Sequence, residues 1–347
     1  MSRVAFSWNG LPQYAARLLK AALDAIPEPC AVVGSRPTVP VEGMERVLRQ
    51  KVHWIDAGQP ARWQDLGLRI PEIYFQSGWS YPAFSALGAE VKANGGKIVG
   101  MSDANWRGDF RQRVLGPVAF RVRHRRHFDA MLVPGRQGQR LMRWFGMPAA
   151  NVHAGMYGAD PTLFRRADPL ADRPKTFLFV GQFIARKDVL GLANGFLNFA
   201  RYDKDWTLHL IGSGGQRDLI PSHPRILVED FVQPEQLTDR FASARFFVLP
   251  SLVEAWGLVV HEAALSGCGL LLSGAIGSAD DLCTPVNGLR FAAGSQTGLE
   301  RALAEAAQFD RDRLCAAEAE SRRLAAQFGP ERFAAEVASL IGQFSGD

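Results

Sequence analysis

The sequence lacks most features of a secreted, membrane-spanning or disulfide-stabilised protein. Its 347 residues include only four cysteines, at positions 30, 268, 283 and 315, and no pair has Cys-x-x-Cys spacing. We therefore expect reduced, structural thiols. No apolar run approaches the roughly 18 to 20 residues that span a bilayer, and the opening MSRVAFSWNG has no apolar signal-peptide core. These absences predict a cytoplasmic protein.

Metal-binding patterns are also absent. None of the seven histidines belongs to a His-Glu-x-x-His motif, and His124 and His127 lie among arginines, which would repel a cation. Two Asp-x-Asp strings occur, Asp203–Asp205 and Asp310–Asp312. The first lies between a predicted helix and a strand, and the second begins a predicted helix, where acidic residues favour the helix dipole. We predict no metal ion and no cofactor.

The sequence does have the composition and length of a soluble protein with two globular domains. It is 47% hydrophobic and 22% charged, and about 150 residues is the usual size of one domain. A polar stretch with two prolines and no periodicity interrupts the chain near its middle. We expect a first domain over 1–165, a linker over 166–175, a second domain over 176–328 and a terminal helix over 329–347.

Short β-rich runs alternate with helical patterns in both halves, which is typical of parallel α/β sheets. The expected strands are 3–7, 31–33, 52–55, 73–76, 97–101, 131–134, 176–180, 207–211, 226–228, 246–249 and 270–272. The expected helices are one through Tyr14, then 81–94, 110–128, 138–145, 189–199, 234–243 and 258–266, with a helical tail from 297 to 344 broken at Gly329-Pro330. This pattern predicts two doubly wound, Rossmann-like domains that face a central cleft, where ligands bind beyond the carboxyl ends of the strands.

Charge is concentrated in one segment. The chain carries +5, but the segment Arg107–Arg143 holds ten arginines against Asp109 and Asp129, so this segment carries +8 and the remainder −3. One basic patch on a near-neutral protein favours a local anionic partner, such as a phosphate group or an anionic membrane face, over nucleic acid. A solvated helix face rich in arginine is the alternative.

Two glutamates carry the most informative pattern. A buried strand ends at Pro250, a loop carries Glu254, and Gly257 opens a helix that contains Glu262. Both carboxylates and the unpaired N–H groups at the helix start, around Gly257 and Leu258, can then face one bound molecule. Carboxylates suit sugar hydroxyls and helix N–H groups suit phosphate oxygens, so a nucleotide sugar would satisfy both.

This segment, Glu254-Ala255-Trp256-Gly257-Leu258 followed by Glu262-Ala263, resembles the signature of family 4 retaining glycosyltransferases of the GT-B fold. The signature is usually Glu-Gly-Phe-Gly-Leu-x-x-x-Glu-Ala, so Trp256 replaces a phenylalanine. The resemblance implies that Trp256, Gly257 and Leu258 are donor-binding residues. The resemblance implies that Glu254 contacts hydroxyls of the donor sugar and that Glu262 binds the ribose. It also implies a C-terminal helix that packs back on the first domain.

A second similarity lies upstream. The run from Phe179 to Lys187 resembles a family segment in which a basic pair holds the donor diphosphate; Lys187 matches the family lysine, Gln182 replaces the usual arginine, and Arg186 can supply the missing charge. Gly212 and Gly214, directly after a strand, match a family Gly-x-Gly near the nucleotide. Gly10 lies where family glycines approach the diphosphate. All of these residues are candidate donor contacts.

The acceptor half is less specific. Relatives often carry a histidine near the reacting carbon, whereas this chain has Asp103 after the strand 97–101. Asp103 can orient an acceptor hydroxyl, or it can cap a following helix.

We therefore expect a metal-independent retaining hexosyltransferase that uses a nucleotide diphosphate sugar, UDP rather than GDP. Its expected acceptor is a hydroxyl of a glycan, of a phosphorylated molecule or of a lipid-linked one, with catalysis by Glu254, Lys187, Arg186 and Asp103. The arginine segment would hold it to the inner face of the cytoplasmic membrane. The alternatives are a nucleotide-sugar epimerase of the same architecture, and a non-catalytic membrane- or nucleic-acid-binding protein on a transferase scaffold.

Overall fold

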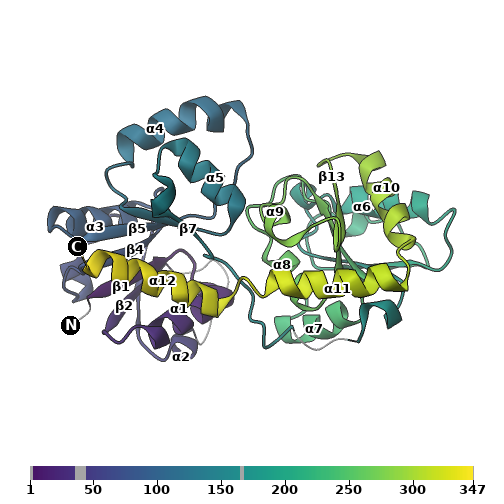
Figure 1. Ribbon diagram of the computed structural model, residues 1–347, viewed down its shortest axis with the longest axis horizontal. Coiled ribbons are helices and arrows are strands. Elements are labelled where there is room, and N and C mark those ends of the chain that lie inside the picture. Colours follow the sequence, from purple (N-terminus) through teal and green to yellow (C-terminus); the bar gives the residue numbers. More distant parts are fainter. Residues whose placement is uncertain (1–2, 36–43, 165–167, 347) are drawn as a thin grey trace. The chain divides into compact units, whose positions relative to one another are not determined.

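The chain forms two compact units, seen in a computed structural model that describes residues 3–35, 44–164 and 168–346 (Figure 1). The first unit comprises Met1–Gly158 together with Phe328–Asp347, and the second comprises Ala159–Gln327. The first two residues of the expected linker, 166 and 167, lie outside the described residues.

The first unit is built on a seven-stranded parallel sheet in the order β3-β2-β1-β4-β5-β6-β7. Its strands are β1 (Val4–Trp8), β2 (Cys30–Ser35), β3 (Val52–Ile55), β4 (Ile73–Ser77), β5 (Lys97–Met101), β6 (Ala130–Val133) and β7 (Val152–Ala154). Its helices are α1 (Gln13–Ala25), α2 (Met44–Leu48), α3 (Pro82–Ala93), α4 (Gly116–Arg123), α5 (Arg136–Phe145) and α12 (Pro330–Ser345).

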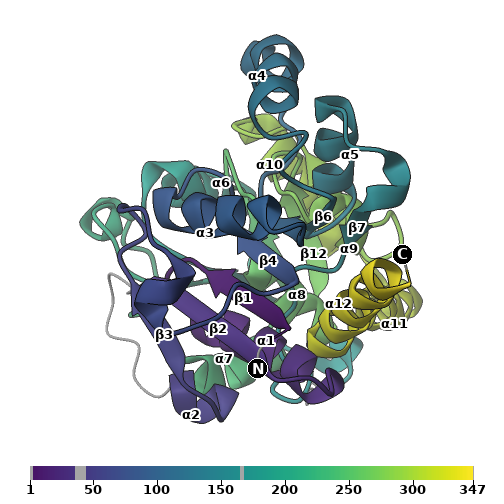
Figure 2. The same cartoon turned by 90° about the vertical axis from the view of Figure 1, so that its left-hand side faces the viewer.

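The C-terminal helix α12 packs against α1 on one face of this sheet (Figures 1 and 2). Phe333, Val337 and Leu340 of α12 are buried in the same core as Val4 and Phe6 of β1. The expectation that the terminal helix returns to the first domain is confirmed.

The second unit repeats the design with a six-stranded parallel sheet in the order β10-β9-β8-β11-β12-β13. Its strands are β8 (Thr176–Val180), β9 (Thr207–Ile211), β10 (Ile226–Glu229), β11 (Phe246–Leu249), β12 (Gly269–Ser273) and β13 (Gly288–Phe291). Its helices are α6 (Val189–Phe199), α7 (Pro234–Ala242), α8 (Leu258–Leu265), α9 (Ala279–Leu282), α10 (Gln296–Ala307) and α11 (Arg311–Ala325). Both sheets are Rossmann-like, as expected.

The strand order reverses once in each sheet. In the first unit the chain leaves β1 toward β2 and β3 and then returns to β4 on the other side; in the second unit β8 and β11 flank the same kind of reversal. Loops that leave the carboxyl ends of two such strands diverge, and the space between them is the usual ligand position in open α/β sheets. The site residues follow from this topology.

The expected helix over 110–128 is wrong in one respect. The structure has a π-helical turn at Arg111–Leu115, followed by the shorter helix α4. Pro117 lacks the N–H that would continue an ordinary helical ladder, and such positions favour a widened turn. The short elements α2, α9, β7 and β13 were also not expected, because they are too brief to produce a periodic pattern.

Two glycines after β9 are required by a close backbone approach. Gly212 and Gly214 have φ of +150° and +147°, and a Cβ at Gly212 would lie 1.9 Å from the carbonyl oxygen of Gly181. The loops after β8 and β9 are also joined by a hydrogen bond of 2.7 Å from the Phe183 N–H to the Ser213 carbonyl. The glycines thus allow the β9 loop to support the β8 loop.

Gly212→Ala is expected to lower the free energy of unfolding by about 2 kcal/mol or more, because it combines a backbone clash with a strained φ. Gly215→Ala is the matched control, since a Cβ there meets nothing within 4 Å, and we expect a change within about 0.5 kcal/mol. Urea unfolding measures both. Equal losses in the two variants would contradict the close-approach explanation.

Candidate functional site

The best candidate site of the second unit lies at the reversal of its strand order. The loop after β8 carries Arg186 and Lys187, and the loop after β11 carries Glu254. The Leu252 N–H donates to the Arg186 carbonyl over 2.8 Å, which holds the two loops together. Residues that are far apart in sequence are therefore fixed beside each other by backbone as well as by charge.

The three charged side chains form one cluster. The Lys187 ammonium pairs with Oε2 of Glu254, and Nη1 of Arg186 lies 3.4 Å from the same oxygen. Nη1 of Arg186 also donates to the Val253 carbonyl over 2.9 Å. The side chains of Lys187 and Glu254 are 11% and 14% exposed, whereas Arg186 is largely exposed. Two cations against one carboxylate leave a net positive charge that can meet an anion.

The start of α8 lies directly after Glu254. Gly257 precedes the helix with φ of +82°, a left-handed conformation that glycine adopts without strain. Glu254 is fixed on the other side, because its N–H donates to the Ala275 carbonyl and its carbonyl accepts from the Gly277 N–H. Leu258 is partly exposed at the first helical position. The N–H groups of a first helical turn have no carbonyl partner earlier in the helix, although the Val260 N–H is bonded to the carbonyl of Gly257, the residue before the helix, over 2.8 Å.

Trp256 has a different place from the one expected. Its side chain is 2% exposed and belongs to the core of the unit, and its carbonyl accepts from the Ser278 N–H. A donor contact through the indole would therefore require Trp256 to leave the core.

Glu262 is the most perturbed carboxyl of the site. Burial raises its pKa to about 7, and among the described residues its side-chain oxygens have no hydrogen-bond or ion-pair partner. The neighbouring His261 instead points into the core, where its Nδ1 accepts from the Ala159 N–H and burial lowers its pKa to about 4. A carboxyl with a raised pKa and no protein partner among the described residues is a frequent property of binding sites.

Four further residues were expected to contact the donor. Gly212 and Gly214 lack side chains because protein backbone, rather than a ligand, occupies the space of their Cβ atoms. Gln182 is exposed at the end of β8, on the same loop as Lys187. Gly10 belongs to the first unit, where its N–H donates to the Ser35 hydroxyl over 2.7 Å.

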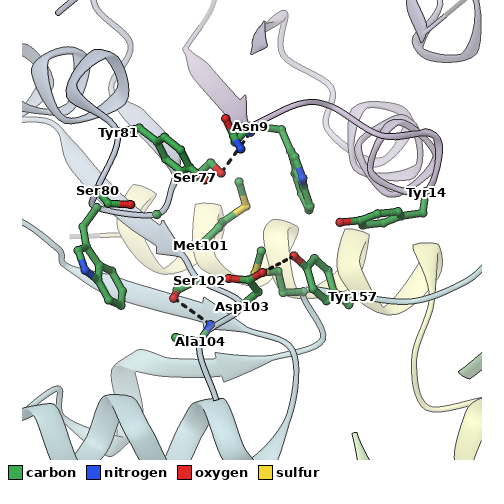
Figure 3. A pocket seen from close by; sticks show the side chains of 14 residues that line it. Asn9, Tyr14, Ser77, Ser80, Tyr81, Met101, Ser102, Asp103, Ala104 and Tyr157 are labelled. Atoms are coloured by element: carbon green, nitrogen blue, oxygen red, sulfur yellow. Dashed lines mark hydrogen bonds between the residues drawn. The ribbon is translucent and has the colours of Figure 1, made fainter. Parts of the chain in front are cut away.

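The first unit has its own pocket at the reversal of its strand order, with a volume of about 410 Å³ (Figure 3). It is lined by residues at or just after the carboxyl ends of β1, β4 and β5, including Asn9, Ser77 and Asp103. Tyr157 donates to Oδ2 of Asp103 over 3.3 Å, and Tyr14 packs edge-on against Tyr157. Figure 3 shows these groups around one space.

Asp103 does not cap a helix. The carboxylate at the next helical start is Asp109, whose Oδ1 accepts from the Gln112 N–H over 2.8 Å. Asp103 is therefore the acidic group of the first-unit pocket, and the capping alternative is wrong. Sequence reasoning missed Tyr14, because an aromatic residue in the first turn of an amphipathic helix is usually a core residue.

The two Asp-x-Asp strings have structural partners. Asp205 pairs with Lys175 over 2.7 Å, and Asp310 caps α11 by accepting from the Arg313 N–H over 2.8 Å. In the part of the chain that the structure describes, no helix is both long and apolar enough to cross a membrane.

Comparison with known proteins agrees with this geometry. Residues 174–308 match the family model of group 1 glycosyl transferases, and no curated protein matches the chain. The site cluster, α8 and Glu262 all lie inside the matched segment. Within the second unit this segment is therefore similar to group 1 glycosyl transferases.

Several solved structures share the fold of the whole chain. Anabaena Alr3699/HepE in complex with UDP and glucose is 14% identical, with a TM-score of 0.74 over 99% of this chain and 100% of its own. Sucrose-phosphate synthase from Thermosynechococcus elongatus is 18% identical, with a TM-score of 0.70 over 100% of both chains. The lipopolysaccharide outer core galactosyltransferase WaaB is 15% identical, with a TM-score of 0.71 over 98% of this chain and 99% of its own. At these identities the likeness shows the GT-B fold.

The raised pKa of Glu262 predicts a pH-dependent cost to stability. The folded pKa of about 7 exceeds the ordinary value of 4.5, so the stabilising contribution of the protonated carboxyl is present below pH 4.5 and is lost as pH rises through 7. Glu262→Gln keeps the shape without the charge. We expect its Tm to exceed that of the wild type at pH 8, with a much smaller difference at pH 5.

Thermal unfolding at the two pH values measures this difference. Glu305→Gln on α10 is the control, because that carboxylate is about half exposed and pairs with Arg313 at the surface. A Glu262→Gln difference that does not change with pH would contradict the assignment.

Proposed function

We propose that this protein is a retaining glycosyltransferase that moves a hexose from a nucleotide diphosphate sugar to a hydroxyl acceptor. One observation carries the proposal: Lys187, Arg186 and Glu254 meet at the strand reversal of the matched domain, beside the start of α8. The two cations, the carboxylate and the helix start would hold a diphosphate and a sugar together. We propose that family 4 is the narrower family.

In this proposal the donor is held at both ends. Glu262 accepts from the two ribose hydroxyls, which suits a carboxylate that has no protein partner among the described residues. Lys187 and Arg186 contact the diphosphate, and Glu254 holds hydroxyls of the hexose. Gln182 lies on the same loop and is available to the diphosphate as a neutral donor.

The chemical step breaks the bond between the anomeric carbon and the diphosphate oxygen. Negative charge grows on the leaving diphosphate, and Lys187, Arg186 and the N–H groups around Gly257 and Leu258 stabilise it. The acceptor hydroxyl forms the new bond on the face from which the diphosphate leaves and transfers its proton to that leaving group, so the configuration is retained. We propose that no metal ion and no cofactor take part.

The acceptor is assigned to the pocket of the first unit. Asp103, the acidic residue that lines it, can accept a hydrogen bond from an acceptor hydroxyl, and Tyr157 already donates to that carboxylate. A glycan fits the polar and aromatic lining of Asn9, Ser77 and Tyr14. Phosphorylated and lipid-linked glycans belong to the same proposal.

The donor base and the cellular role are proposed from the neighbours. Because HepE was solved with UDP and glucose, and WaaB is a galactosyltransferase of lipopolysaccharide, a UDP-hexose and a role in polysaccharide biosynthesis are the first to test. The segment Arg107–Arg143 would hold the enzyme at the inner face of the cytoplasmic membrane.

Donor binding is expected to depend on Glu262 and on pH. The hydroxyl donors of the ribose favour the ionised carboxylate, so binding releases a proton and affinity rises as pH increases from 6 to 8, through the pKa of about 7. Glu262→Gln should weaken binding of a UDP-hexose about tenfold or more at pH 8 and should remove the pH dependence. Calorimetry with UDP-, GDP- and ADP-hexoses measures both effects. Unchanged affinity in the variant would contradict the ribose contact.

Turnover is expected to depend on Lys187. Lys187→Ala should lower kcat about 10² to 10³-fold, because it removes a preorganised cation from the leaving group. Lys175→Ala is the control, since that lysine forms a surface pair with Asp205. The product anomer, measured by proton NMR, tests retention: inversion would contradict the mechanism. An epimerised sugar formed from donor alone would indicate the epimerase, and nucleotide binding without turnover would indicate the non-catalytic alternative.

A further inference from the structure

One apolar surface of the first unit is left uncovered by its core. The π-helical turn Arg111–Leu115 and α4 form a helical arm, hereafter the α4 arm, which projects from the unit on the outside of α5 (Figures 1 and 2). The exposed apolar side chains of the arm and of the residue directly before it, 46% to 79% accessible, are Phe110, Val114, Leu115, Val118 and Val122. Four of them recur every fourth residue, which is the spacing of one helix face.

The opposite side of the arm fixes it to the unit. Gln112, Pro117 and Phe120 are buried, and the Phe120 ring packs against Phe128 and Phe145. The arm therefore has two apolar faces: the side chains of one face are buried in the core, and those of the other face are exposed. Monomeric proteins seldom leave such an apolar face uncovered without an interaction that uses it.

The outward face is surrounded by positive charge. Arg111, Arg121 and Arg123 are exposed on the arm, and none has a carboxylate within 4.0 Å among the described residues. Asp109 at the base of the arm is near Arg107, at 3.7 Å. An apolar stripe bordered by arginines matches the composition of helices that lie in the interface of an anionic bilayer.

A pocket of the same unit is also lined by aromatic and arginine side chains. It has a volume of about 680 Å³ and lies between the π-helical turn and α5. Its lining includes Trp106, Trp144, Arg113, Arg136, Arg140 and Arg143.

The two tryptophans are held in place. The Arg140 guanidinium lies 4.6 Å from the Trp106 ring centre, and the Trp144 indole N–H donates to the Arg113 carbonyl over 3.2 Å. Tryptophan is enriched at the headgroup level of membranes, and arginine binds phosphate bidentately.

We propose that the α4 arm is a membrane-insertion face: its apolar stripe enters the acyl boundary of an anionic bilayer, while the neighbouring tryptophan–arginine pocket receives lipid phosphate headgroups. Charge complementarity selects the bilayer over a second copy of the chain, because two copies would bring their arginines together. The inference extends the membrane partner of the proposed function from net charge to a defined apolar surface. It concerns binding alone and is tested without donor or acceptor, so its failure is distinguishable from failure of the transferase proposal.

The test is sedimentation of the full chain with vesicles of equal parts phosphatidylglycerol and phosphatidylcholine. We expect the combined variant Phe110→Ser, Val118→Ser, Val122→Ser to lower the partition coefficient about tenfold or more. The matched control is Tyr202→Ser, Leu227→Ser, Phe231→Ser on the second unit, whose side chains are comparably exposed. This control should bind as the wild type does. Arg121→Glu with Arg123→Glu should also lower binding more than tenfold, at about fivefold per arginine.

Each other outcome would overturn the proposal. Binding that high salt abolishes but the serine variant leaves unchanged would indicate surface charge without insertion. Absence of vesicle binding, with thermal stabilisation by inorganic phosphate alone, would indicate a pocket for a free phosphate. Self-association that the serine variant removes, measured by sedimentation without vesicles, would indicate a dimer face. Circular dichroism verifies that every variant is folded.

Discussion

The arrangement of both units depends on one topological constraint: the chain adds strands to one side of its first strand and then returns to the other side. In the second unit this reversal separates the loops after β8 and β11, and these loops hold all three charges of the site. Because parallel strands end at the same edge of the sheet, residues about 70 positions apart in sequence become neighbours without a long connection. The Lys187–Glu254 pair then joins the two loops, so the geometry of the site and the stability of the sheet edge are coupled.

The site contains charged groups that add little to the stability of the fold. A partly buried ion pair gains little net stability, and Glu262 is a carboxyl whose pKa burial has raised to about 7. Neither group improves the core. In the proposed donor complex, Lys187 would have the diphosphate as a second acceptor and Glu262 would gain the ribose hydroxyls as hydrogen-bond donors. Polar groups that lack hydrogen-bond partners in the empty site are the groups that a bound ligand can supply with partners.

Five strands, 52–55, 97–101, 176–180, 207–211 and 246–249, were predicted to the residue. The strand 246–249 is the clearest case, because a parallel strand buried on both faces is a continuous apolar run. The motif positions of Glu254 and Lys187 were also readable, but their direct pairing was not, because nothing local links residues in different loops. The Gly212 and Gly214 conformations show the same limit. A Gly-x-Gly after a strand indicates close approach, and only the structure shows that the approaching group is the backbone of the Gly181–Phe183 loop.

The exposed apolar face of the α4 arm could not be predicted from the sequence, for a different reason. Net charge can be summed along a sequence without knowing the fold, so the basic segment was visible at once. Apolar exposure cannot be summed in this way, because Phe120 and Val122 are both apolar and only packing decides that one is buried and the other exposed. The widened turn before Pro117 is a further feature that helical spacing in the sequence does not show. The distinction between a solvated arginine-rich helix and a membrane-facing one therefore depends on which apolar side chains the core leaves uncovered.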